Sequence, residues 1–334
     1  MKSFIKAHRI KTVSLVSLFL SVLLLFGAFG ANTVNAARDV DVKAAKTDAD
    51  VAYIMENGLY NFSDKEPKDI KLPSSIPSEL TDKLSHDLNK YTQAASMVYV
   101  DLETGFSIRY NENRLFRGAS LVKAPYMMTV LDMIKNGKLS LDKKMTYKSS
   151  YSRSGTVQIP KDCEDGEELT LKRVIEYLIY YSDNTAFYML QIKCCSTGEF
   201  SKFAEKNYNA EFYKNNNWLN AYGVAAAFVD LYKKSCEGDE LYVWFLELMK
   251  QANENKFIKS GIPTDENGDS KYVVAHKYGE DVNSLNDAAI IFYKDRPYLL
   301  IILNDYLSNS ARSIFKEVSE DIFNIHEYIV NFDN

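Results

Sequence analysis

The sequence contains little of what metal centres and disulfide frameworks require. It has four histidines and four cysteines in 334 residues, with no His-Glu-x-x-His and no Cys-x-x-Cys pair. These residues are too scattered to suggest a tetrahedral zinc site, so we expect no metal and no other cofactor. The cysteines are Cys163, Cys194, Cys195 and Cys236. Sequence alone does not choose among their pairings, and it favours buried or loosely bridged thiols.

The chain also has fewer basic than acidic residues. The chain has 40 Lys and Arg against 45 Asp and Glu, a net charge of −5. An acidic chain is a poor ligand for the phosphate backbone, so we expect no nucleic-acid partner. No internal repeat or low-complexity block is present. With 46% hydrophobic and 25% charged residues, the composition is that of a globular protein.

The N-terminus carries the clearest local signal. A basic stretch, an apolar run over residues 13–31 and small residues near 36 are typical of a signal peptide over residues 1–36. The expected location is therefore secreted or extracytoplasmic, or membrane-anchored if the apolar run is not cleaved. Residues 37–75 are polar and interrupted by prolines, which indicates a tether. Residues 76–334 form the expected functional domain.

Apolar periodicity divides this domain into blocks of strands and helices. Strands are predicted near both ends of the domain, over 95–102, 106–110, 271–277, 288–293 and 298–304. Helices are predicted before, between and after them, over 78–93, 120–135, 171–181, 185–193, 224–234 and 310–329. This order predicts an α+β fold in which the first and last segments share one antiparallel sheet and a helical subdomain is inserted between them.

A candidate catalytic pair opens the first central helix, where Ser120 is followed three residues later by Lys123. A serine hydroxyl is a weak nucleophile and needs a base within hydrogen-bond reach. Residues three apart on a helix share one face, so Lys123 is placed to act as the base for Ser120. The spacing alone has little weight, because Ser3, Ser140 and Ser313 show it too.

Two further motifs distinguish Ser120 from the other three serines. Ser-Asp-Asn stands at 182–184, at a junction between predicted helices, and Lys-Tyr-Gly stands at 277–279 on a predicted strand. In isolation the first is typical of a helix N-cap and the second of an edge strand ending in a turn. In this order they resemble the class A β-lactamases and penicillin-binding serine acyltransferases, whose motifs are Ser-x-x-Lys, Ser-Asp-Asn and Lys-Thr-Gly. The resemblance runs from about residue 78 to the C-terminus and implies a β-lactamase/transpeptidase-like fold.

The resemblance implies catalytic roles for matching residues. Ser120 would be the acylated nucleophile and Lys123 its base. Ser182 would relay a proton to the leaving nitrogen. The backbone amides of Ser120 and Glu280 would form the oxyanion hole.

It also implies a set of substrate-binding residues. Asn184 would hold the substrate amide, and Lys277 would attract the substrate carboxylate. Gly279 would let the strand approach the ligand closely. Tyr278 departs from the family pattern, because a bulky phenol replaces a small hydroxyl that is expected near the substrate carboxylate.

A second departure concerns deacylation. Class A β-lactamases carry a Glu-x-x-x-Asn loop that positions the hydrolytic water, and here only Glu211 with Asn215 fits it by letters. The segment before the next helix looks too short for that loop. We therefore expect an exported serine hydrolase or acyltransferase that is acylated by β-lactams or D-Ala-D-Ala peptides and deacylates slowly, acting as a monomer. A competent class A β-lactamase and a non-catalytic cell-wall-binding homologue remain the alternatives.

Overall fold

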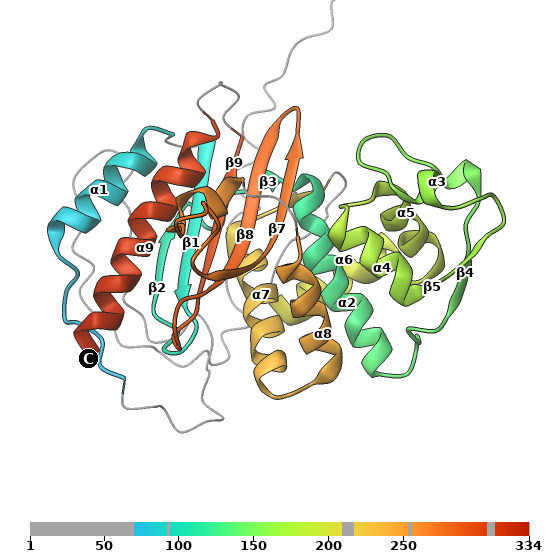
Figure 1. Ribbon diagram of the computed structural model, residues 1–334, viewed down its shortest axis with the longest axis horizontal. Helices are drawn as coiled ribbons and strands as arrows, with labels where there is room; N and C mark the ends of the chain where they lie inside the picture. Colours follow the sequence, from blue (N-terminus) through green and yellow to red (C-terminus); the bar gives the residue numbers. More distant parts are fainter. Residues whose placement is uncertain (1–69, 92–93, 209–216, 253–255, 306–310, 334) are drawn as a thin grey trace, which may run out of the picture. The chain divides into compact units, whose positions relative to one another are not determined.

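The computed structural model describes residues 70–91, 94–208, 217–252, 256–305 and 311–333 (Figure 1). All of them belong to one compact unit, residues 42–334. The predicted signal peptide and most of the tether lie outside the described residues. Within the described part, no helix is both long and apolar enough to span a membrane. All four cysteines are free thiols.

A five-stranded antiparallel sheet has the strand order β2-β1-β9-β8-β7. Its strands are β1 (Ala95–Asp101), β2 (Ser107–Tyr110), β7 (Val273–Asp281), β8 (Ser284–Phe292) and β9 (Tyr298–Asn304). The register of β1 on β9 runs from Ala95 opposite Asn304 to Asp101 opposite Tyr298. The first and last segments thus share one sheet, as the sequence predicts.

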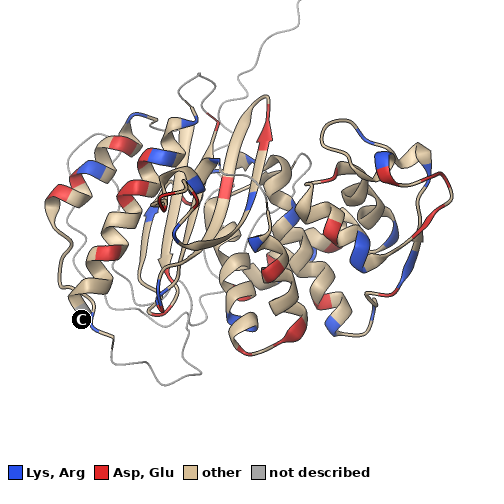
Figure 2. Cartoon of the chain, viewed as in Figure 1, with Lys and Arg blue, Asp and Glu red and all other residues tan. Residues whose placement is uncertain are grey.

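Two terminal helices, α1 (Ser78–Asn89) and α9 (Ser313–Asp333), lie together on one face of the sheet (Figure 1). Leu84 and Leu88, one turn apart on α1, are fully buried in the cluster that these helices form with the sheet. Both helices carry acidic and basic residues along their length (Figure 2). Lys90 joins the helices through ion pairs to Asp87 at 2.7 Å and to Glu317 at 3.2 Å.

The opposite face of the sheet packs on the helical region. Along β1, Val98 and Val100 face this second core, whereas Met97 and Tyr99 face the terminal helices, as the alternation of a strand requires. The helices of this region are α2 (Lys123–Lys135), α3 (Ile159–Asp162), α4 (Leu171–Tyr180), α5 (Asn184–Lys193), α6 (Thr197–Tyr208), α7 (Ala221–Cys236) and α8 (Glu240–Lys250).

Short elements connect the helices. They are the strand pairs β3 (Phe116–Arg117) with β6 (Trp218–Leu219) and β4 (Lys144–Thr146) with β5 (Glu168–Thr170), and the 3-10 turns η2 (Ala119–Val122), η3 (Ser149–Tyr151) and η4 (Phe257–Gly261). The pairing of β3 with β6 matters most for the site. It ties the chain just before Ser120 to the chain just before α7.

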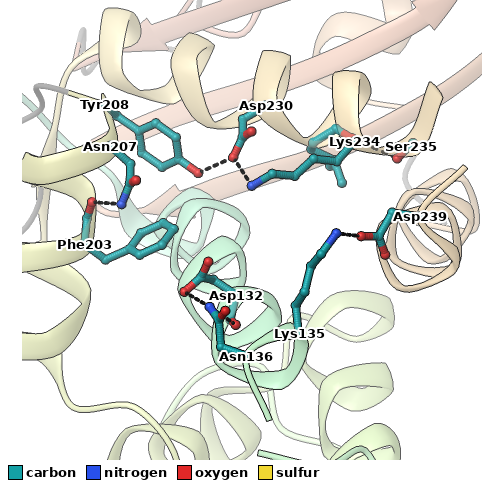
Figure 3. Close-up of polar contacts among 11 residues, drawn as sticks. Asp132, Lys135, Asn136, Phe203, Asn207, Tyr208, Asp230, Lys234, Ser235 and Asp239 are labelled. Atoms are coloured by element: carbon teal, nitrogen blue, oxygen red, sulfur yellow. Dashed lines mark hydrogen bonds and ion pairs between the residues drawn. The ribbon is translucent and has the colours of Figure 1, made fainter. Parts of the chain in front are cut away.

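Polar contacts fasten the helices of the second core to one another (Figure 3). The hydroxyl of Tyr208, at the end of α6, donates to Asp230 of α7 at 3.0 Å, and Lys234 reaches the same carboxylate at 2.8 Å. Lys135, at the end of α2, forms an ion pair with Asp239 before α8. These contacts link α6 to α7 and the C-terminal end of α2 to the start of α8.

A close approach of η4 to α9 yields a stability prediction. A Cβ added at Gly261 would stand 2.5 Å from the Lys316 carbonyl oxygen and 2.5 Å from the Ser319 Cβ. Gly261→Ala should therefore lower the free energy of unfolding by about 1–3 kcal/mol, as overpacking does. Thermal unfolding followed by circular dichroism measures this loss.

Gly198, in the first turn of α6, is the matched control because nothing lies within 4 Å of an added Cβ. Gly198→Ala should leave the melting temperature unchanged or slightly raised, since alanine stabilises helices relative to glycine. Equal melting temperatures for the two variants would contradict the predicted clash.

Candidate active site

The first motif stands at the turn from β3 into α2. Ser120 lies in η2, and Lys123 begins α2 with only 1% of its surface exposed. The Lys123 Nζ is 3.0 Å from the Ser120 Oγ. The predicted nucleophile and base are therefore within hydrogen-bond distance, as the three-residue spacing indicates.

Two asparagines clamp the turn that presents Ser120. Asn217 donates its side-chain amide to the Ala119 carbonyl at 2.8 Å, and its own carbonyl accepts from the Gly118 N–H at 2.7 Å. Asn286 of β8 donates to the Arg117 carbonyl at 2.8 Å. Ala119 has a φ of 46°, which is unfavourable for a residue with a Cβ. The hydrogen bonds of Asn217 and Asn286 offset the backbone strain at Ala119, the residue directly before the nucleophile.

The second motif forms the junction between α4 and α5. Asp183 is fully buried and caps α5 by accepting from the Ala186 N–H at 2.8 Å. It also accepts from the backbone amides of Gln158 and Ile159, which fastens the loop before α3 to the junction. Ser182 has a φ of 53°, so the chain turns sharply there and directs Ser182 toward Lys123.

Asn184 completes this junction with a two-sided contact. Its Oδ1 accepts from the Lys123 Nζ at 2.8 Å, and its Nδ2 donates to the Ser154 carbonyl at 2.7 Å. The amide orientation is thereby fixed, with the oxygen toward the lysine. Lys123 also donates to the Ser182 carbonyl at 2.6 Å.

The third motif lies on the edge strand β7. The Lys277 Nζ is 3.0 Å from the Ser182 Oγ, and the Lys123 Nζ is 3.4 Å from the same oxygen. Ser182 thus stands between two buried amino groups. Three segments that are far apart in the sequence meet at this hydroxyl.

Gly279 sets how closely β7 approaches the nucleophile. A Cβ added there would stand 2.4 Å from the Gly118 carbonyl oxygen, 2.5 Å from the Leu121 nitrogen and 2.9 Å from the Ser120 nitrogen. Only glycine permits this contact. It brings the Ser120 amide next to the strand that continues into Glu280, whose amide is the other predicted oxyanion donor.

Tyr278 follows Lys277 on β7 and packs against the core of the terminal helices. Its ring stacks on Phe257 with a centroid separation of 5.3 Å and an interplanar angle of 18°, against the core of the terminal helices. The Lys277 Nζ lies 4.7 Å from the ring centroid. The Tyr278 ring therefore packs β7 against the core of the terminal helices. Its contact with substrate stays a prediction.

Burial and charge control the protonation of Lys123. Removal of the amino group from water lowers its pKa well below that of an ordinary lysine, and the nearby Lys277 lowers it further, while Asp183 opposes the shift. Its hydrogen-bond acceptors at Ser120, Ser182 and Asn184 are neutral oxygens.

The structure brings together every described residue of the three motifs. Glu211 lies outside the described residues, so its predicted role as a deacylation base is untested. Sequence reasoning missed Asn217 and Asn286, whose partners become visible only in the folded chain. In the described part of the chain, no group of three or more His, Cys, Asp or Glu could hold a metal ion.

The fold and the three meeting motifs define a β-lactamase-like serine hydrolase. The profile of the Beta-lactamase enzyme family matches residues 79–326, and the chain belongs to that family. A curated relative, the D-alanyl-D-alanine carboxypeptidase DacF of Bacillus subtilis (strain 168), is 28% identical over 147 residues. That match covers 43% of this chain and 36% of DacF, so the chain spans only about a third of that relative's length.

Solved structures share the fold at low sequence identity. PBP-A aligns with a TM-score of 0.67 and 17% identity over 77% of this chain and 100% of its own. A PBP-A variant was solved as an acyl-enzyme complex with penicillin G, at the same TM-score and identity. A β-lactamase from Chitinophaga pinensis DSM 2588 gives a TM-score of 0.65 and 22% identity over 74% of this chain and 99% of its own.

The contact at Gly279 predicts a catalytic defect. Gly279→Ala should push β7 away from the Ser120 turn and slow labelling by a fluorescent penicillin roughly a hundredfold, since a displacement of about 1 Å can have that effect. The rate is measured by fluorescence of the protein band over time. Gly198→Ala serves again as the control, and equal labelling rates for the two variants would refute the role of this contact.

Proposed function

We propose that Ser120 is acylated by β-lactams and by peptides that end in D-Ala-D-Ala, and that the acyl-enzyme is hydrolysed slowly. The observation that carries the proposal is the 3.0 Å separation of the Lys123 Nζ and the Ser120 Oγ, in a site where burial favours the neutral amine. A neutral lysine at that distance accepts the hydroxyl proton as the oxygen attacks.

Acylation follows from the proposed roles with all protons accounted for. The Ser120 proton passes to Lys123 while the Ser120 Oγ bonds to the substrate carbonyl carbon. The backbone amides of Ser120 and Glu280 stabilise the oxyanion. The C–N bond then breaks, and the leaving nitrogen takes the Ser182 proton. Lys123, at 3.4 Å, returns its proton to Ser182 and becomes neutral again.

Substrate recognition rests on the remaining polar groups. Lys277 presents a cation for the carboxylate at the end of a D-Ala-D-Ala peptide or on a β-lactam ring system. Asn184, held by Ser154 and Lys123, presents its amide to the substrate. The relatives support this substrate class, because one is a D-alanyl-D-alanine carboxypeptidase and another forms an acyl-enzyme with penicillin G.

The proposed location is outside the cytoplasmic membrane. The signal-like residues 1–36 support export, with residues 13–31 as an anchor if cleavage does not occur. Peptidoglycan peptides and β-lactams are both met there. We expect a monomer, and the substrate is a small molecule rather than a nucleic acid.

Slow deacylation is proposed because the segment that would carry a second base is short. Only residues 209–217 lie between the end of α6 and the start of β6. A competent β-lactamase is the second candidate. It would be favoured if Glu211, in that segment, acts as the deacylation base. A non-catalytic homologue is the third, and it is the outcome if Ser120 does not react.

The nucleophile is tested by intact mass. Incubation with a penicillin should raise the mass of the protein by one ligand, and Ser120→Ala should abolish the increase. Ser140→Ala and Ser313→Ala are matched controls, because both serines share the Ser-x-x-Lys spacing and should not affect labelling. Labelling that survives in Ser120→Ala would overturn the assignment.

The base is tested by pH dependence. Because the pKa of Lys123 is lowered, the neutral fraction grows as the pH rises through that value. The acylation rate should therefore increase with pH and level off well below the pKa of an ordinary lysine. Stopped-flow mixing with a chromogenic cephalosporin measures the profile. A rate that is flat from about pH 5 to 9 would contradict lysine as the base.

Deacylation is tested by product kinetics. A burst of about one equivalent of product followed by a slow steady rate is expected if acylation outruns deacylation. Glu211→Gln should then change the steady rate little. Rapid turnover without a persistent adduct, together with an adduct in Glu211→Gln, would show instead a working β-lactamase with Glu211 as its base.

A further inference from the structure

A second pocket opens between α4 and α8, in the helical region. Its volume is about 310 Å³, and its lining includes Arg173, Glu176, Tyr180, Tyr181, Trp244 and Gln251. Tyr181 directly precedes Ser182 in the chain, so the pocket adjoins the junction that forms one wall of the candidate active site. No role in the acylation chemistry accounts for these residues.

The pocket presents aromatic rings to solvent. Tyr180 and Tyr181 are 37% and 39% exposed, and their rings meet edge to face at 4.7 Å. Trp244 is half-buried on the opposite wall. Trp244 also packs in part against the helical core, whereas Tyr180 and Tyr181 belong to neither core cluster. Partly exposed aromatic rings around a hollow are typical of a binding site.

The charges around the pocket are already paired. The Arg173 guanidinium lies 3.1 Å from the Glu176 carboxylate, and Glu247 forms an ion pair with Lys250. Lys172 lies over the Trp244 ring at 5.7 Å. The pocket therefore has its own guanidinium and carboxylate groups paired within the protein, and Lys172, outside its lining, adds a cation at Trp244. A neutral ligand would meet aromatic rings in this pocket, together with the guanidinium, carboxylate and amide groups that line it.

We propose that this pocket binds a saccharide, specifically an N-acetylated amino sugar of a cell-wall glycan. A pyranose ring has an apolar face that packs on aromatic rings and an edge of hydroxyl groups that hydrogen-bond to planar polar side chains. The inference rests on the proposed function, since a glycan-linked peptide is then the substrate.

The chain contains two tryptophans, which allows a direct test. Trp244 lines the pocket, and Trp218 lies in β6 beside the Ser120 turn. In Trp218→Phe, Trp244 is the sole reporter. Titration of this variant with N-acetylglucosamine oligomers should change its fluorescence saturably, and adding Ser120→Ala should leave the affinity unchanged.

Two variants test the pocket wall. Tyr181→Ala and Gln251→Ala, each in the Trp218→Phe background, should weaken saccharide binding about tenfold, the loss of roughly one stacking or hydrogen-bond contact. Phe332→Ala removes an exposed ring at the end of α9 and is the matched control. If circular dichroism shows that Tyr181→Ala does not fold, the saccharide affinity of Gln251→Ala decides the test.

The outcomes separate this inference from the proposed function. Penicillin acylation at Ser120 without any saturable saccharide signal would overturn the saccharide site alone. Saccharide binding without acylation would overturn the proposed function and leave the site standing. A Trp244 response to a D-Ala-D-Ala peptide but not to the saccharide, or equal saccharide affinity in all variants, would also overturn the inference.

Discussion

Two amino groups buried beside one hydroxyl are the constraint on which the site depends. Lys123 and Lys277 are each 1% exposed and both reach the Ser182 Oγ. Burial of like charges is unfavourable, and the structure relieves it by lowering the pKa of Lys123. Hydrogen bonds offset the rest of the cost: Lys123 donates to the Ser182 carbonyl and to Asn184, and Lys277 donates to the Ser182 Oγ and to the Tyr278 carbonyl.

The same constraint explains where the backbone is strained. Ala119 and Ser182 both adopt positive φ values, one before the nucleophile and one at the shared hydroxyl. Such conformations cost on the order of 1–3 kcal/mol each and persist only where surrounding contacts fix them. Asn217 and Asp183 supply those contacts. Activation of the serine is thus a property of the packed framework.

Much of the fold was predictable from local patterns, and the exceptions have physical causes. Thr170 directly precedes the predicted helix over 171–181 and caps it, because its hydroxyl accepts from the Arg173 N–H at 3.1 Å. The strand predicted from 288 begins at Ser284 instead, because Asn286 and Asp287 interrupt the apolar pattern although both are fully buried. Helices α6 and α8 were missed. α6 is polar overall and buries only Phe200, Ala204 and Tyr208, and α8 is rich in apolar residues on several sides.

The motifs of the site were visible in the sequence, but their supports were not. Asn217 and Asn286 act on the Ser120 turn from segments far along the chain, and no local spacing encodes such contacts. Tyr278 was expected near the substrate carboxylate, and the stacking of its ring on Phe257 is likewise a contact that no local spacing encodes.

The placement of Lys277 also bears on how the protein acquires activity. β7 follows the helical region in sequence, yet it must pack on the turn after β3 before the two amino groups can meet. Contacts of such long sequence separation form slowly in folding. The arrangement of Lys123 and Lys277 around the Ser182 hydroxyl therefore arises only with the completed tertiary structure.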